Sequence, residues 1–302
     1  MRRFFIMSAM LALTICVGCS SLSDKQMLEV KSFSKNSEGY VDGPGKVYRI
    51  YGDAALECGI VRSATYSDGV LAKDEVDKSL KTRDDIYSSA AKMDLALDVL
   101  QSYSRLIGAL ASEKFDKITA SEVVTASAEL DGVLSSFSGE EVNCSFGDCA
   151  ALAVRTIGWM YIKKRQTDSL KTIIAKADPL IEDVTVKIKA LLDLYEEQKL
   201  IDALENDLKS NYAILVKRGG SAWNVDGTGQ YASIMGKIEK VRLVCESCRT
   251  ATENYRLAHH KLAACIAEDK KLEASFDEFR KLCIEIKKMK ELIDRDTVIF
   301  KK

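Results

Sequence analysis

Apolar side chains recur at every third or fourth position over long stretches of the chain, and runs with alternating apolar and polar residues are few. This spacing is typical of helices that bury one face. In the first half it predicts a helix over 74–112, capped by Asp74, with an apolar face formed by Ile86, Ala90, Met93, Leu97, Leu100, Ser104, Ile107 and Leu110.

The second half carries a longer stripe of the same kind. Asp178 is a good N-cap residue and Pro179 suits a first helical position, so we expect a helical arm over 148–176 to stop and restart there. The new helix would continue for about ten turns. Its apolar face is formed by Leu180, Val184, Ile188, Leu191, Tyr195, Ile201, Leu204, Leu208, Tyr212 and Leu215. So regular a stripe indicates a core or a partner seam and not a cofactor site.

Weaker signals fill the rest of the body. Residues 46–66 fit either a helix or a short strand near their start, and helix is favoured. After a glycine-rich loop over 219–229, a final helix is expected from 230 to about 290, with a break near 268–271. Together these elements predict an all-α fold, an elongated antiparallel bundle of long helices over residues 46–302.

Residues 19–45 differ in composition from this body. They are rich in Ser, Lys and Gly and end in the turn signal Asp42-Gly43-Pro44-Gly45. We therefore expect a flexible tether over 19–45, about 90 Å long when fully extended, in front of the bundle.

The first 18 residues form a separate unit. Two arginines precede an uncharged run over 4–17, which has the length of a signal-peptide core and is too short for a membrane-spanning helix of roughly 20 residues. The segment Cys16-Val17-Gly18-Cys19 resembles the lipobox of bacterial lipoproteins, although that family usually has Leu where Cys16 stands. The resemblance implies signal cleavage after Gly18 and lipid attachment at Cys19. The alternative is an ordinary secreted protein in which Cys19 stays free.

The residue after Cys19 bears on location. In the lipoprotein family, Asp at that position tends to retain the protein in the inner membrane, whereas Ser20 resembles the outer-membrane sorting class. The resemblance thus implies a periplasm-facing outer-membrane lipoprotein in a Gram-negative bacterium, or otherwise a cell-membrane lipoprotein, held by N-terminal acyl chains. The body also resembles a loose set of bacterial lipoproteins with long-helix bundles, through Leu97–Leu110 and Ala177-Asp178-Pro179. That second resemblance implies a fold and a cellular location but no catalytic residue.

Charge narrows the range of partners. Without Arg2 and Arg3 the chain has 42 basic and 45 acidic residues, and no long block carries one sign. A nucleic-acid surface would need a basic face, so we expect no nucleic-acid partner.

Nine cysteines are present, and an exported chain favours disulfides. Cys144 and Cys149 flank a short loop and form the best candidate pair, whereas the connectivity of five others cannot be deduced: Cys58, Cys245, Cys248, Cys265 and Cys283. A metal site built from Cys245, Cys248, Cys265 and the two histidines has suitable residue types. However, Cys265 would lie roughly 26 Å from Cys248 along a straight helix, so we expect no metal.

Candidate catalytic residues are scarce. His259 and His260 are the only histidines, and on a helix they point about 100° apart, so we expect them not to form a site together. Motifs of phosphate-binding loops, dinucleotide-binding folds, zinc proteases and serine hydrolases are missing. We therefore expect no catalytic residue and no cofactor, and leave a small-molecule ligand open. Trp223, in the glycine-rich loop, is a possible partner contact, or it folds back on the bundle end.

These observations predict a lipid-anchored envelope protein with a structural or protein-interaction role, whose partner is another envelope protein. The alternatives are a helical membrane-perturbing protein and an exclusion or immunity lipoprotein. A hydrolase of envelope polymer is disfavoured by the missing motifs.

Overall fold

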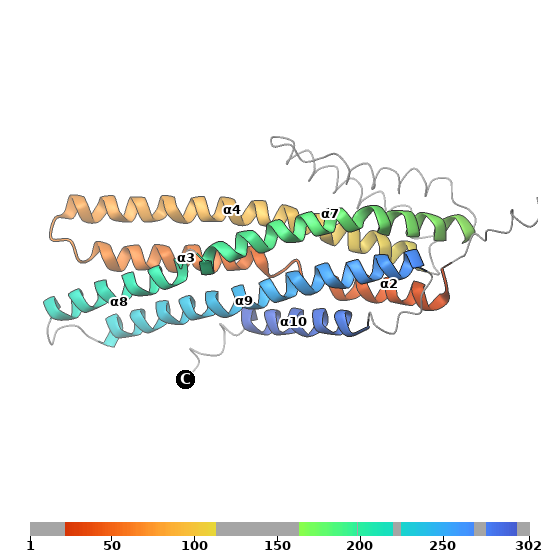
Figure 1. Ribbon diagram of the computed structural model, residues 1–302. Coiled ribbons are helices and arrows are strands. Elements are labelled where there is room, and N and C mark those ends of the chain that lie inside the picture. The colour runs from red at the N-terminus through yellow and green to blue at the C-terminus, as the bar shows by residue number, and fades with distance from the viewer. Residues whose placement is uncertain (1–21, 113–162, 198, 220–224, 269–275, 295–302) are drawn as a thin grey trace, which may run out of the picture.

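The computed structural model describes residues 22–112, 163–197, 199–219, 225–268 and 276–294. Every regular element in these ranges is a helix, which confirms the all-α prediction. In Figure 1 the helices run side by side along a common long axis. Among the described helices, none combines the length and apolar character that a bilayer crossing requires.

The expected tether is wrong for residues 24–37. These residues form helix α2 (Asp24–Ser37), which begins with a capping box. The backbone amide of Gln26 donates to the Ser23 hydroxyl at 3.2 Å, and the Ser23 amide donates to the Gln26 side chain at 2.9 Å. Val30 and Phe33 are fully buried against the rest of the bundle, so α2 belongs to the folded body.

Helix α3 (Pro44–Ser63) follows α2, with proline in its first turn, which confirms helix over strand for this region. The chain then turns into α4 (Gly69–Leu110). The cap of α4 is Asp68, whose carboxylate accepts from the Val70 amide at 2.7 Å. The predicted start at Asp74 is therefore too late. Figure 1 shows α2 and α3 following one another along the length of α4.

A row of glycines lets α3 approach α4 closely. Gly45, Gly52 and Gly59 recur every seven residues and all face α4. A methyl group at Gly59 would overlap the Ser79 side chain, and one at Gly45 would overlap Asp94. Only glycine leaves room for this contact, which holds the two helices together along the whole length of α3.

The predicted helix restart at Pro179 is also wrong. Helix α7 (Lys163–Glu197) passes through Pro179 without ending, and Pro179 is exposed, so its lost amide hydrogen bond is on the solvent side. The interruption comes later, at Lys199, which adopts a positive φ of 52° before α8 (Leu200–Gly219) begins. The long stripe of the second half is thus shared by two helices.

Helix α9 (Val225–Glu268) lies at the centre of the described part and packs against α3, α7, α8 and α10 (Phe276–Asp294). It begins five residues before the predicted residue 230. Its buried face supplies much of the core: Ile234, Ile238, Val241, Val244, Ala251, Tyr255, Ala258 and Leu262.

Candidate functional site

Large apolar side chains are exposed together at the end of the molecule formed by the α3–α4 turn and the end of α8. Arg218 of α8 donates to the Thr65 carbonyl, which ties α8 to that turn. Val70 is the most exposed, at 68 %. We call the exposed residues at this end the distal surface: Ile60, Tyr66, Val70, Leu71, Ile214 and Val216.

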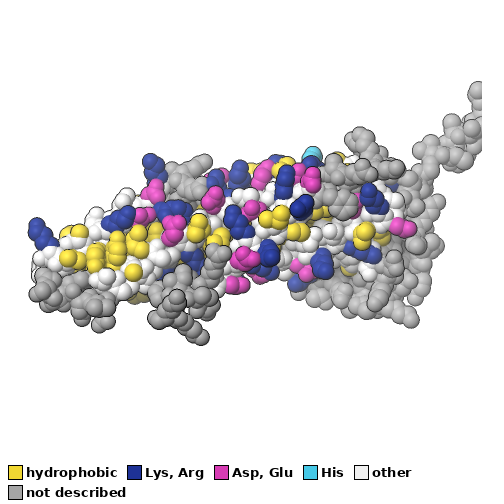
Figure 2. Space-filling model, turned by 90° about the horizontal axis from the view of Figure 1, so that it is seen from below, with side chains coloured by type: hydrophobic (Ala, Val, Ile, Leu, Met, Phe, Trp, Pro, Cys, Tyr) yellow, Lys and Arg dark blue, Asp and Glu magenta, His cyan; other side chains and the backbone are white. Residues whose placement is uncertain are grey.

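The distal surface is unlike the rest of the described exterior. The other exposed large apolar side chains are spread over α2, α4, α7, α9 and α10: Leu28, Leu80, Val186, Leu191, Leu243 and Ile284. Figure 2 shows a strip of hydrophobic side chains over the half of the molecule where α3, α8 and the start of α9 lie, and more mixed charge over the other half. Scattered apolar residues are ordinary, whereas a gathered group marks a contact site.

The distal surface lies far from the start of the described chain. In Figure 1 the α3–α4 turn and the end of α8 occupy one end, and the start of α2 lies toward the other. Helix α4 has 42 residues and connects the two ends, a length of about 60 Å at 1.5 Å per residue.

A second feature is a polar chain at the other end, in which Asp178 links the two histidines. His259 Nδ1 and His260 Nδ1 each lie 2.9 Å from an oxygen of the Asp178 carboxylate. Tyr103 of α4 joins through its hydroxyl, 2.6 Å from His259 Nε2. The two rings do leave α9 in different directions, but Asp178, reaching from α7, bridges them.

The protonation of this chain follows from its geometry. Burial opposes ionisation of Asp178, but hydrogen bonds from the two histidines hold its pKa below the usual range. Burial also lowers the pKa of His259 and outweighs the raising effect of Asp178. With Asp178 ionised, each Nδ1 carries a proton and donates, and His259 Nε2 accepts from Tyr103.

The order Tyr103, His259, Asp178 has the form of a hydroxyl activated by a histidine and a carboxylate. However, His259 is 0 % exposed and Tyr103 is 2 % exposed, and rings pack against the imidazole, with Phe33 at 5.6 Å and Tyr103 at 5.4 Å between centroids. A substrate cannot touch an enclosed hydroxyl, so this arrangement satisfies buried polar groups and fixes α4, α7 and α9 relative to one another.

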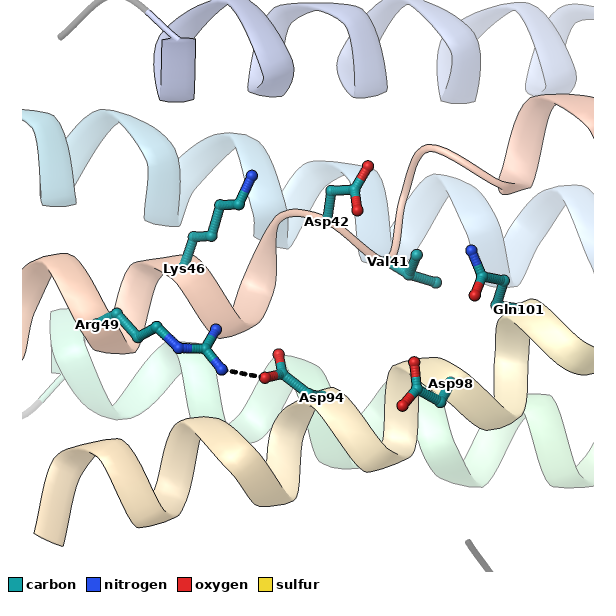
Figure 3. A pocket seen from close by; sticks show the side chains of 7 residues that line it. All are labelled: Val41, Asp42, Lys46, Arg49, Asp94, Asp98 and Gln101. Atoms are coloured by element: carbon teal, nitrogen blue, oxygen red, sulfur yellow. Dashed lines mark hydrogen bonds and ion pairs between the residues drawn. The ribbon is translucent and has the colours of Figure 1, made fainter. Parts of the chain in front are cut away.

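A third feature is an open cleft of about 380 Å³ beside the α2–α3 connection. Figure 3 shows Arg49 of α3 reaching across to Asp94 of α4. Asp42, on the same rim, lies 3.4 Å from Lys290 of α10. Charges of both signs compensate one another here, so the cleft does not select a cation or an anion. Its lining residues are Val41, Asp42, Lys46, Arg49, Asp94, Asp98 and Gln101.

The sequence-predicted sites lie outside the described residues. This holds for Gly18 and Cys19, for the candidate disulfide pair Cys144 and Cys149, and for Trp223.

For the remaining cysteines the disulfide expectation is wrong. Within the described ranges, five cysteines are free thiols: Cys58, Cys245, Cys248, Cys265 and Cys283. Cys245 and Cys248 are fully buried on α9 and act as small apolar core residues. Burial raises the pKa of Cys245 to about 12, which keeps its thiol protonated and unreactive. The described residues also hold no group of three or more metal-ligating side chains.

Comparison of the chain with protein-family models, with curated proteins and with solved structures finds no match. The interpretation of its surfaces therefore rests on the residues themselves. The distal surface was not predicted from the sequence, although Tyr66, Val70 and Leu71 flank a turn signal, Ser67-Asp68-Gly69. Apolar residues at a turn are the signal that could have revealed it.

Proposed function

We propose that this protein is a non-catalytic, lipid-anchored envelope protein that presents its distal surface to another envelope protein. The single observation that carries the proposal is that the α3–α4 turn and the end of α8 carry exposed large apolar side chains, at the end of the molecule opposite the start of α2. Apolar groups left in water at one place gain free energy when a partner covers them, on the order of 25 cal/mol per Å².

The anchor and the distal surface fit one geometry. Cys19 precedes the cap of α2, Ser23, by only four residues, a reach of about 14 Å at most. An acylated Cys19 would thus hold the α2 end of the bundle near the lipid surface. The distal surface would then stand up to about 60 Å away, where a partner protein can reach it.

The proposed setting follows from the signal sequence. Acyl chains at Cys19 would hold the protein in the membrane, and Ser20 favours the outer membrane, facing the periplasm, in a Gram-negative cell. The decisive test of the anchor is Cys19→Ser, which should abolish metabolic labelling with palmitate and release the protein from the membrane fraction. Persistent labelling would refute the lipid anchor.

The partner proposal is tested by crosslinking and pull-down from envelope preparations. The double variant Val70→Ser with Leu71→Ser removes the most exposed part of the distal surface and should reduce partner recovery at least tenfold. A matched control is Val186→Ser with Leu191→Ser on α7, which alters two side chains of similar exposure elsewhere. Equal recovery with both double variants would contradict the proposal.

A second candidate is a membrane-perturbing function, because the same apolar end could enter a bilayer surface. Vesicles of anionic phospholipid loaded with a dye distinguish the two functions. Leakage that depends on Val70 and Leu71 would favour the membrane function, and partner recovery without leakage would favour the proposed one.

A further inference from the structure

The carboxyl group of Glu29 stands out among the described residues. Glu29 lies on α2 and is 0 % exposed, and neither of its side-chain oxygens has a hydrogen-bond partner. A buried ionised carboxylate without a partner is strongly unfavourable, and a buried neutral carboxyl group is much less so. This position therefore favours the protonated acid.

The face of α2 that carries Glu29 is the face that docks on the bundle. One turn before Glu29, Gln26 Nε2 donates to the Cys265 carbonyl of α9 at 3.4 Å. One turn after it, the Phe33 ring packs against Tyr255 at 5.2 Å and against Phe279 at 5.8 Å between centroids. Glu29 lies between these contacts on the same helix face, so its carboxyl can reach water only if α2 moves away.

The titratable groups on the elements packed against α2 are largely engaged elsewhere. On α9, His259 is bonded to Asp178 and Tyr103, and Lys261 lies 2.7 Å from Glu278 of α10. Glu278 also lies 3.4 Å from Lys281. Other titratable groups on α4, α9 and α10 include Arg105, Tyr255, Arg256, Cys265, Arg280 and Cys283, and the Tyr255 hydroxyl lies 3.0 Å from the Ser104 hydroxyl.

We propose that α2 is a pH-dependent latch, docked on the bundle while the Glu29 carboxyl is protonated and released when it ionises. In its docked state α2 keeps the body close to the first residues of the chain. Release would add the length of 22–43, about 70 Å of extended chain, between those residues and the body. This last consequence rests on the proposed anchor at Cys19, whereas the latch itself does not.

The direction of the pH dependence is fixed by the environment of Glu29. Burial raises its pKa from 4.5 to about 7, and the charge of Lys25 offsets only part of that rise. Because the docked state holds the proton more tightly than the released state, docking is strongest below pH 4.5 and weakens as pH rises to about 7. Between pH 6 and pH 8 the docking equilibrium should fall roughly tenfold.

Hydrogen exchange of the full chain in detergent tests the latch. Protection factors of the α2 amides should fall roughly tenfold from pH 6 to pH 8, whereas those of α3 should change little. The variant Glu29→Gln keeps the shape of the side chain but cannot ionise, and it leaves both histidines in place. The protection of its α2 amides should therefore not depend on pH. Glu38→Gln, an exposed residue at the end of the same helix, should behave as the wild type.

Three outcomes would overturn the latch. These are wild-type α2 protection that does not change with pH, an equal fall in Glu29→Gln, and loss of α2 docking at pH 6 in both Glu29→Gln and the apolar variant Glu29→Met. Retained α9 protection shows that each variant has folded. None of these readouts depends on acylation, so failure of the latch and failure of the proposed anchor are distinguishable.

Discussion

The two ends of this bundle depart from the usual distribution of side chains in opposite ways. At the distal end, large apolar residues such as Val70 and Leu71 are exposed. At the α2 end, polar and ionisable residues such as Glu29, Tyr103 and His259 are buried. Exposed apolar groups are available to a partner, whereas buried polar groups fix one arrangement of helices and respond to protons. The difference suggests contact at one end and control of position at the other.

The largest loss of stability is expected from a substitution in the contact between α3 and α4, the helices that connect the two ends. Gly59→Ala should lower the free energy of unfolding by about 3 kcal/mol, because the added methyl group overlaps Ser79 and the helices must separate. Gly236→Ala on α9 is the control, since nothing lies within 4 Å of the added group, and it should raise stability by up to about 1 kcal/mol. Urea denaturation measures both, and equal effects would refute a close-packed glycine row.

The next effect tests the buried polar chain of the α2 end. Asp178→Ala should cost about 2 kcal/mol at pH 7, because it leaves the buried His259 donor without an acceptor. Asp183→Ala, which removes only an exposed ion pair with Lys187 on the same helix, should cost less than about 0.5 kcal/mol. Similar losses in the two variants would show that the bridge contributes no more than a surface pair.

The same chain predicts a pH dependence on the acid side. The folded pKa of His259 lies below its ordinary 6.5, so the stability from burying the neutral ring is complete above pH 6.5 and is lost as pH falls through the folded value. Stability should decrease by up to about 1.4 kcal/mol per pH unit in that interval. Calorimetry of the Glu29→Gln variant, which lacks the opposing titration of Glu29, checks the sign across this range, and stability of that variant that increases on acidification there would contradict it.

A smaller effect is expected when a single hydroxyl is removed from each end. Tyr103→Phe should cost about 1 kcal/mol, because His259 Nε2 loses its hydrogen bond in the interior. Tyr66→Phe at the distal surface should change stability by less than about 0.5 kcal/mol. If chemical denaturation showed a larger loss of stability for Tyr66→Phe than for Tyr103→Phe, the proposed difference between the two ends would be contradicted.

The smallest effect on stability is expected at the distal surface itself. Val70→Ser with Leu71→Ser should leave the free energy of unfolding within about 0.5 kcal/mol of the wild type, because both side chains are exposed in the folded state. A larger loss would mean that these residues support the fold, and any loss of partner binding by this variant would then need another explanation.

The parts of the fold that could be predicted are those whose buried positions are apolar. The face of α4 that includes Met93, Leu97 and Leu100 repeats at helical spacing and is buried as expected. The docked face of α2 could not be recognised in this way, because four of its six buried residues are polar: Gln26, Glu29, Ser34 and Ser37.

The site residues were less predictable because they depend on contacts between distant segments. Asp178 has the local sequence of an N-cap, yet it lies within α7 and bridges two histidines about 80 residues further on. Likewise, the distal surface arises because α8 ends beside the α3–α4 turn. No local sequence pattern indicates that these two segments lie next to each other.

The spacing of the glycines on α3 has a mechanical consequence. Seven residues of a straight helix fall about 20° short of two full turns, so a strict seven-residue row drifts slowly around its surface. Gly45, Gly52 and Gly59 nevertheless all face α4, as residues at seven-residue spacing do in helix pairs that wind around each other with a left-handed twist. A pair wound in this way resists bending more than two separate rods, so a force applied at one end of the molecule is carried to the other.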